Sequence, residues 1–263
     1  MSLEQEDQNL EKTKIIVANW KMYGSYEFAI DYFKTICDAI LPNNFLFIIC
    51  PPYPYIGVGA RIIAEHQSEQ IVIGAQNVSR FTKLSSTGDI SVEILEDCMV
   101  KSVIVGHTER RAIGETDDII NKKLKLLQSS EIEPILCIGE SEEEYKNGKT
   151  EEVLRAQIRG ALKDVRKLES LMISYEPVWA IGTGKTPKQE EISNTSKYIT
   201  DEVGKVCKVE NLHVLYGGSV NGDNIAIMLQ NNDIDGLMLG GFSRETKKFC
   251  EFFENLAKSN WKK

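Results

Sequence analysis

The sequence has few of the residues that build metal centres and disulfide frameworks. It contains only three histidines, His66, His107 and His213, and its six cysteines are scattered without a Cys-x-x-Cys pair. Zinc sites need clustered His and Cys ligands, so a dedicated metal site is not expected. Scattered cysteines in a chain of this length are typical of reduced, mostly buried thiols, which favours a cytoplasmic location.

Long apolar runs and basic runs are also missing. No stretch approaches the length of a membrane span, and the first eleven residues are polar and acidic, unlike a signal peptide. With 39 acidic and 31 basic residues, the formal charge is −8, and such a surface repels nucleic acid. Membranes and nucleic acids are therefore not expected partners. An anionic substrate would need a local positive site that works against this overall charge.

The chain has the length and composition of one sizeable domain. Its 263 residues are 42% hydrophobic, which suffices for a single large core. No linker rich in Pro, Gly or Ser divides it. We expect residues 1–13 to form a flexible N-terminal extension and residues 14–263 to form one catalytic domain.

Eight short apolar runs recur along the chain, with stretches of helical periodicity between them. Nearly continuous apolar runs, rather than alternating ones, are typical of parallel strands covered on both sides. The expected strands are residues 14–18, 45–50, 71–75, 102–106, 134–138, 171–175, 213–216 and 236–239, with a closing helix over 245–259. This pattern predicts the α/β fold class, as a (β/α)8 TIM barrel in a single domain. An open, doubly wound sheet is the alternative.

The ends of the first and fourth strands carry candidate catalytic residues, because barrel chemistry sits in the loops that follow the strands. Alternation places Asn19 and Lys21 on one side of the chain, facing the barrel mouth. Lys21 would supply positive charge there, although a solvated lysine at a loop start is an equal alternative. His107 can donate to a substrate carbonyl while its other nitrogen accepts from a helix-terminal amide. A purely structural histidine is the competing interpretation.

The sixth strand stops at Glu176, and burial among apolar groups makes a carboxylate a better base. The loop that follows carries apolar residues and two glycines, Gly182 and Gly184. Hinges around an apolar tip are what a water-excluding lid needs, so we interpret the loop as a lid. Permanent packing against a neighbour is the alternative. The lid residues are Pro177, Val178, Trp179, Ala180, Ile181, Gly184 and Lys185.

Glycines follow the last two strands, in Gly217-Gly218-Ser219 and in Gly240-Gly241. A residue without a Cβ lets main-chain amides come close to a phosphate group. One glycine pair would be compatible with a tight turn alone. Two pairs after these particular strands are typical of phosphate-binding barrels.

Taken together, these segments resemble the triose-phosphate isomerase family. They occur in the family's order over nearly the whole chain, and the stretch Tyr-Glu-Pro-Val-Trp-Ala at 175–180 is the most specific of them. The matching segments are residues 18–22, 74–77, 106–111, 137–140, 175–185, 216–220 and 240–241.

The resemblance implies a cofactor-free, metal-free isomerisation of dihydroxyacetone phosphate and D-glyceraldehyde 3-phosphate through an enediolate, in glycolysis and gluconeogenesis. It assigns the proton transfer to Glu176. It assigns stabilisation of the developing oxyanion to His107, Lys21 and Asn19. The residues implied to hold the phosphate are Gly182, Ser219, Gly240 and Gly241, and those implied to support the site are Glu109 and Thr108.

A homodimer is also implied, in which Thr87 of the long third loop reaches the partner's site near Asn19. The chain departs from the family at Thr108, where serine is usual, and at Ser86 and Asp89 in the third loop, which put the strength of the dimer contact in doubt. The lid is also one or two residues shorter than the commonest form. Further departures, which could alter the phosphate geometry or the size of the accepted sugar, are Phe242 and Arg244 in place of alanine and leucine.

Three rival functions stay open on the sequence. A phosphorylated four-carbon sugar could be isomerised by the same base and electrophile. A Schiff-base aldolase on the same fold would use Lys21 as its nucleophile. A non-catalytic sugar-phosphate-binding protein would keep the pocket without the turnover.

Overall fold

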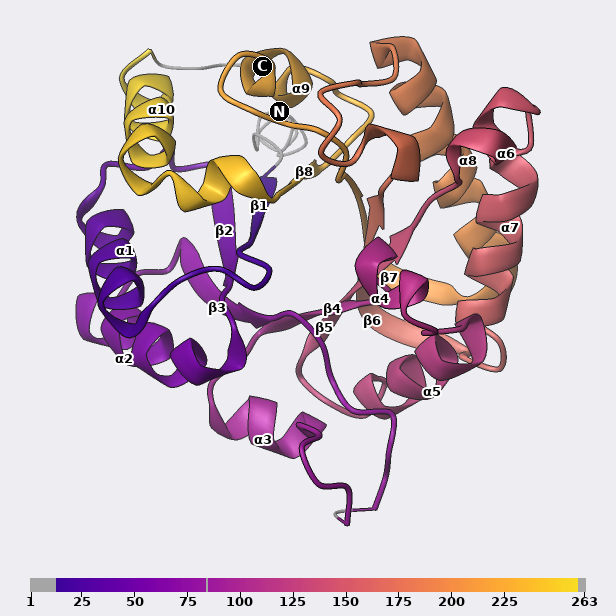
Figure 1. The fold of residues 1–263 in the computed structure, drawn as a ribbon, viewed down its shortest axis with the longest axis horizontal. Coiled ribbons are helices and arrows are strands. Elements are labelled where there is room, and N and C mark those ends of the chain that lie inside the picture. The colour runs from indigo at the N-terminus through magenta and orange to yellow at the C-terminus, as the bar shows by residue number, and fades with distance from the viewer. Residues whose placement is uncertain (1–12, 84, 260–263) are drawn as a thin grey trace, which may run out of the picture.

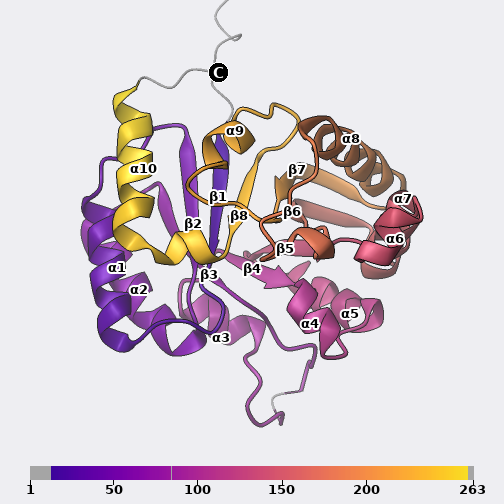
Figure 2. The same ribbon diagram turned by 45° about the horizontal axis from the view of Figure 1, so that its top comes forward.

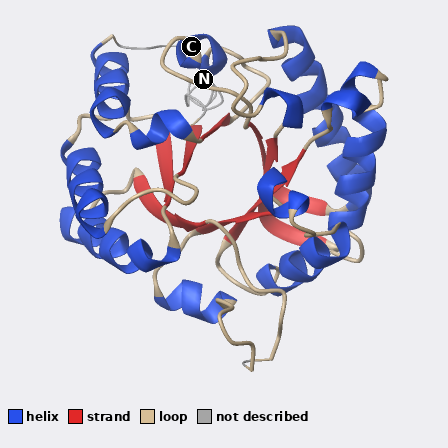
Figure 3. Ribbon diagram, in the orientation of Figure 1, coloured by secondary structure: helices blue, strands red, loops and turns tan. Residues whose placement is uncertain are grey.

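The computed structural model describes residues 13–83 and 85–259, so the expected N-terminal extension lies outside the described residues except for Thr13. Eight parallel strands form a closed barrel in the order of the sequence, and helices surround it (Figures 1 and 3). The predicted (β/α)8 barrel in a single domain is confirmed. No helix in the described part of the chain is both long enough and apolar enough to span a membrane.

The elements alternate along the chain. The strands are β1 (Lys14–Asn19), β2 (Phe45–Cys50), β3 (Ile71–Ala75), β4 (Ser102–Val105), β5 (Glu133–Ile138), β6 (Lys167–Tyr175), β7 (Lys208–Tyr216) and β8 (Gly236–Leu239). The α-helices are α1 (Tyr26–Asp38), α2 (Ile56–His66), α3 (Val92–Asp97), α4 (Thr108–Ala112), α5 (Asp117–Leu127), α6 (Glu142–Lys146), α7 (Thr150–Ala161), α8 (Gln189–Val206), α9 (Ile225–Leu229) and α10 (Thr246–Lys258). Short 3-10 helices are η1 (Tyr53–Tyr55), η2 (Val178–Ala180) and η3 (Gly241–Arg244).

The continuous apolar character of the strands reflects two separate cores. Alternate strand residues point to opposite faces, and in β1 Ile15 and Val17 belong to the cluster inside the barrel. Ile16 and Ala18 belong to the larger cluster between the barrel and the helices. Because both faces are buried, neither shows the polar alternation of a half-exposed sheet.

Closure of the barrel depends on Gly236. β8 pairs with β1 through Ile15↔Gly236 and the residues that follow. A Cβ on Gly236 would stand 1.8 Å from the carbonyl oxygen of Ile15, so only glycine permits this approach. The β1–β8 pairing closes the sheet in the order of the sequence and so excludes the open doubly wound sheet.

Strands β6 and β7 begin four and five residues earlier than expected. Lys167 pairs with Lys208 and Ser170 with Asn211 along this extension, where Lys167 also forms an ion pair with Glu210 at 2.8 Å. Polar and apolar residues alternate along this extension: Lys167 and Glu169 are exposed, whereas Leu168 between them is buried. Strands predicted from continuous apolar runs therefore begin too late in β6 and β7.

Capping and aromatic packing set the helices around the barrel. Ser25 accepts a hydrogen bond from the amide of Phe28 at 3.1 Å and begins α1. At the other end of the chain, Phe253 of α10 meets Phe47 of β2 edge-on, with ring centroids 4.8 Å apart. This contact fixes α10, and with it η3 at the barrel mouth (Figure 2).

Candidate active site

A pocket of about 680 Å³ opens at the carboxyl ends of the strands. The alternation of side chains along each strand decides which of them enter it. Ile15 and Val17 of β1 and Met172 of β6 face the barrel interior. Asn19 lies on the same side of its strand as Ile15 and Val17, and Glu176 lies on the same side as Met172. Of the predicted site residues, the pocket is lined by Asn19, Lys21, His107, Glu176, Ile181, Gly182, Gly184, Ser219, Gly240 and Gly241.

Glu176 and His107 face each other at the bottom of this pocket. The Glu176 side chain is 1% exposed, and its Oε1 lies 3.7 Å from Nε2 of the His107 imidazole, which is 8% exposed. The other oxygen, Oε2, accepts hydrogen bonds from the amide and the hydroxyl of Thr108, at 3.3 and 3.2 Å. The carboxylate is therefore held beside the imidazole but is bonded to Thr108.

The orientation of His107 comes from the turn that carries it. Gly106 adopts φ +71°, a left-handed conformation that favours glycine and redirects the chain after β4. His107 then caps α4, and its Nδ1 accepts from the amide of Glu109 at 3.1 Å. The amide predicted for the second ring nitrogen is thus present. A neutral imidazole that accepts at Nδ1 carries its proton on Nε2, toward the pocket.

Lys21 is fixed in a left-handed turn at the end of β1, with φ +56°. Its amide donates to Oδ1 of Asn19 at 3.0 Å, and its carbonyl accepts from Gln76 at 2.8 Å. The ammonium group donates to Oε1 of Glu109 at 2.7 Å. Burial alone would raise the pKa of Glu109, but the hydrogen bond and the charge of Lys21 outweigh burial and lower it.

The lid residues adopt a 3-10 turn followed by two left-handed glycines. Gly182 has φ +68° and Gly184 has φ +75°. The hydroxyl of Ser219 donates to the carbonyl of Ala180, and the amide of Gly184 donates to that hydroxyl at 3.3 Å. The lid therefore contacts the loop after β7. Pro177 and Ala180 are buried, Val178 is 37% exposed, and Lys185 is exposed and pairs with Glu142 at 3.7 Å.

The lid is anchored by a residue to which sequence reasoning gave no role. Glu140 follows β5 and is fully buried; its Oε1 accepts from the indole of Trp179 at 3.0 Å and from Tyr175 at 3.1 Å. Burial raises the pKa of Glu140, and these two hydrogen bonds oppose the rise. Trp179 also stacks on Tyr145, with centroids 4.4 Å apart and planes at 29°. A carboxylate directly after a strand was the available signal for Glu140, whereas nothing in the sequence pointed to Tyr145.

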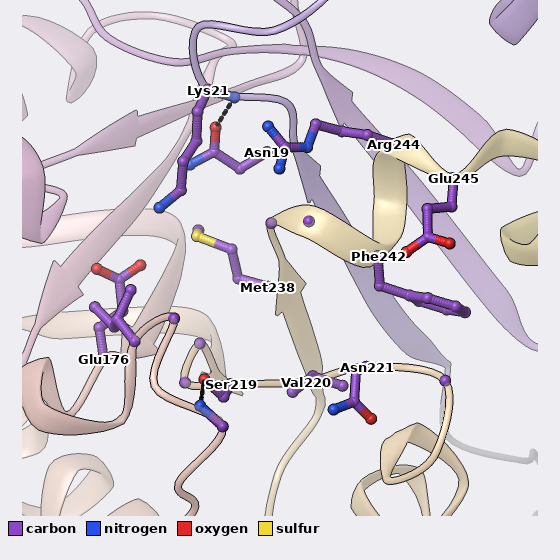
Figure 4. Close-up of a pocket in the computed structure, with 18 of the residues that line it drawn as sticks. Asn19, Lys21, Glu176, Ser219, Val220, Asn221, Met238, Phe242, Arg244 and Glu245 are labelled. Carbon is purple, nitrogen blue, oxygen red and sulfur yellow. Dashed lines mark hydrogen bonds between the residues drawn. The ribbon is translucent and has the colours of Figure 1, made fainter.

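Gly240 and Gly241 line the pocket at the start of η3. Phe242 of η3 also lines the pocket but does not point toward Glu176 (Figure 4). Its ring is 7% exposed and packs edge-on against Phe249 of α10, with centroids 6.0 Å apart. In Figure 4 the ring extends away from Glu176.

One predicted contact residue is not brought to the pocket within this chain. Thr87 is exposed in the loop 76–91, which projects from the barrel between β3 and α3 (Figures 1 and 2). Ser86 and Asp89 lie in the same loop. None of these three residues lines the pocket.

The closed parallel barrel, with a pocket of charged side chains at the carboxyl ends of its strands, defines the protein as a (β/α)8-barrel enzyme. The family model described as triosephosphate isomerase matches residues 14–256. Relatives named triosephosphate isomerase include those of Dictyoglomus turgidum, 38% identical over 91% of this chain and 98% of the relative, and of Colwellia psychrerythraea, 37% identical over 89% and 94%. The relative in Mycoplasmoides gallisepticum is 36% identical over 92% and 97%. The chain belongs to the triosephosphate isomerase family.

Gly139 provides a test of how the backbone positions Glu176. A Cβ on Gly139 would stand 1.9 Å from the carbonyl oxygen of Glu176, so Gly139→Ala must displace the strand end that carries the carboxylate. We expect the free energy of unfolding in urea to fall by about 2 kcal/mol or more. The matched control is Gly57→Ala in α2, where a Cβ meets nothing within 4 Å and alanine favours the helix. Equal stability of the two variants would contradict this account of Gly139.

Proposed function

We propose that this protein interconverts dihydroxyacetone phosphate and D-glyceraldehyde 3-phosphate, as an aldose–ketose isomerase of glycolysis and gluconeogenesis. One observation carries the proposal. A buried carboxylate and an imidazole lie 3.7 Å apart in a pocket that is also lined by a double glycine. Membership of the triosephosphate isomerase family supports the same substrate pair.

In the proposed reaction, Glu176 is the base. Its carboxylate removes a proton from the carbon next to the substrate carbonyl, and the released electron pair forms the enediolate. The same carboxyl group then returns a proton to the neighbouring carbon, and proton movement between the two oxygens completes the isomerisation. To reach the substrate, Glu176 must leave its hydrogen bonds with Thr108, so Thr108 acts as a resting partner for the base.

Three groups would stabilise the developing oxyanion. Nε2–H of His107 donates to it, the Lys21 ammonium supplies charge, and Asn19 holds the turn that carries Lys21. Glu109 supports both partners, since its amide orients the His107 ring and its carboxylate orients the Lys21 side chain. These groups are in place before the charge forms, which is why they favour the transition state.

The phosphate would be held mainly by main-chain amides. The proposed residues are Gly182 of the lid, Ser219 after β7, and the pair Gly240 and Gly241 after β8. All four line one pocket. Closure of the lid over a bound phosphate would exclude water from the enediolate. We propose that neither a metal nor a cofactor takes part, because the base and the oxyanion-stabilising groups all come from the chain.

Membership of the family does not favour the rival functions. The relatives are named for a triose phosphate rather than a tetrose phosphate. The side-chain nitrogen of Lys21 is engaged in an ion pair with Glu109 at 2.7 Å, whereas a Schiff-base nucleophile must be free to attack the substrate carbonyl. The presence of both Glu176 and His107 in the pocket argues against a merely binding protein.

We also propose a homodimer in the cytoplasm. The projecting loop with Thr87 supports a second subunit, as do exposed apolar side chains, with Met22 100% and Ile113 72% exposed. The six free cysteines support a reducing compartment. Recovery of the protein from the secreted rather than the cytoplasmic fraction of its cells would contradict the location.

Shortening the base tests the proposed reaction. Glu176→Asp withdraws the carboxylate by one methylene, and a misplacement of this size lowers turnover by about 100-fold. We expect kcat to fall by that factor and KM for glyceraldehyde 3-phosphate to change little, in an assay coupled to reduction of the ketone product. Glu143→Asp, on the exposed side of α6, is the control and should behave like wild type. Near-normal kcat in Glu176→Asp would refute the role of the base.

Shortening the lid tests whether it protects the intermediate. Deleting Ile181 and Gly182 should let the enediolate reach water before the proton returns. The enediolate then expels its phosphate, so methylglyoxal and inorganic phosphate should accumulate above the spontaneous rate of the free substrate. Both products can be followed in one reaction. Loss of activity without either product would count against a sequestering lid.

The assembly can be tested by sedimentation equilibrium. A homodimer predicts a mass about twice the 29.6 kDa of the chain. Thr87→Glu, which places charge on the projecting loop, should shift the population toward the single chain. A wild-type mass of one chain at micromolar concentration would rule the homodimer out.

A further inference from the structure

Two cations flank the double glycine of the pocket, and only one of them belongs to the catalytic set. A Cβ built on Gly240 would stand 3.6 Å from Cε of Lys21, and a Cβ built on Gly241 would stand 3.6 Å from Nη2 of Arg244. Both cations line the pocket.

The charge of Arg244 is not offset by a neighbouring carboxylate. Lys21 is paired with Glu109 at 2.7 Å, and the carboxylate next to Arg244 in the chain, Glu245, is taken by Lys248 at 2.6 Å. Within residues 13–83 and 85–259, no ion pair is formed by Arg244. Its guanidinium instead lies over the ring of Tyr23, 4.8 Å from the centroid. A contact with an aromatic face orients an arginine but leaves its full positive charge available.

The aromatic contact orients the guanidinium, and a hydrogen bond secures the short helix that carries it. Tyr23 meets Phe28 edge-on at 5.2 Å, and Phe28 meets the fully buried Trp20 at 5.0 Å. In η3, the hydroxyl of Ser243 donates to the carbonyl of Gly240 at 2.7 Å. In Figure 4 the Arg244 side chain extends from η3 on the same side as Asn19 and Lys21, while Phe242 extends the other way. The cation is therefore fixed beside the double glycine.

We propose that Arg244 is an additional phosphate-specificity residue of this isomerase, whose charge increases the affinity of the pocket for a phosphate dianion. The inference rests on the proposed function and deepens it. In a chain with a formal charge of −8, an anionic substrate approaches against the overall field, and a fixed cation beside Gly241 opposes that field locally. The effect falls on phosphate binding, not on proton transfer.

Replacement of Arg244 by leucine tests the proposal. We expect KM for glyceraldehyde 3-phosphate and the inhibition constant of inorganic phosphate each to rise about three- to tenfold in Arg244→Leu, the range for one screened charge a few ångströms away. kcat should stay within about twofold. Turnover of D-glyceraldehyde, which has no phosphate, should not change. Arg244→Lys should restore most of the affinity, because it keeps the charge.

Lys247→Leu is the matched control, since it removes one positive charge from an exposed residue outside the pocket. It should match wild type. Equal KM and inhibition constants for Arg244→Leu and Lys247→Leu would overturn the proposal. So would an equal loss with D-glyceraldehyde, because that result would indicate a structural role. Should Arg244→Leu fail to fold, Arg244→Gln carries the same comparison.

Binding of inorganic phosphate, measured by calorimetry, distinguishes failure of the proposed function from failure of the proposed role of Arg244. If the wild-type protein does not isomerise triose phosphates, the proposed function fails. A weaker phosphate affinity in Arg244→Leu than in Lys247→Leu would still support the role of Arg244. If wild type is active and the two variants bind phosphate equally, the inference about Arg244 fails alone.

Discussion

The alternation of side chains along closed parallel strands is the constraint on which this site depends. Once β8 pairs with β1 through Gly236, every second residue of each strand must face the barrel axis. Ile15 and Val17 therefore lead to Asn19, and Met172 leads to Glu176. The side chains proposed to be catalytic at the ends of β1 and β6 continue the inner core, and the rigid sheet holds them in register. A site built in this way needs little rearrangement before reaction.

Charge is the second organising feature, because an acidic protein must hold an anion. Cations and amide donors lie together at one end of the barrel. Two carboxylates lie among them, because Glu109 pairs with Lys21 and Glu176 lies beside His107. Lys21 is directed toward the reacting end, and Arg244 lies beside the glycines proposed to hold phosphate. With these separate positions, a change at Arg244 would alter phosphate affinity without altering the rate of proton transfer.

Much of this arrangement could be predicted from the sequence. Apolar runs located the cores of all eight strands, and the residues after β1, β4 and β6 marked the pocket, because apolar character ends abruptly there. The first residues of β6 and β7 were missed, since apolar residues alternate there with exposed polar ones and form no continuous apolar run. The contact of Thr108 with Glu176 and the stack of Tyr145 on Trp179 join residues distant in sequence. Tertiary contacts of this kind leave no local pattern to read.

The most direct test of the central claim is the fate of hydrogen during turnover in deuterated water. One carboxylate that moves a proton between adjacent carbons must exchange some of it with solvent, so nuclear magnetic resonance should find deuterium on the carbons that Glu176 serves. The account predicts such labelling with the wild-type protein and none above background with Glu176→Gln. Labelling at the wild-type rate in Glu176→Gln, or isomerisation by wild type without any label, would contradict it.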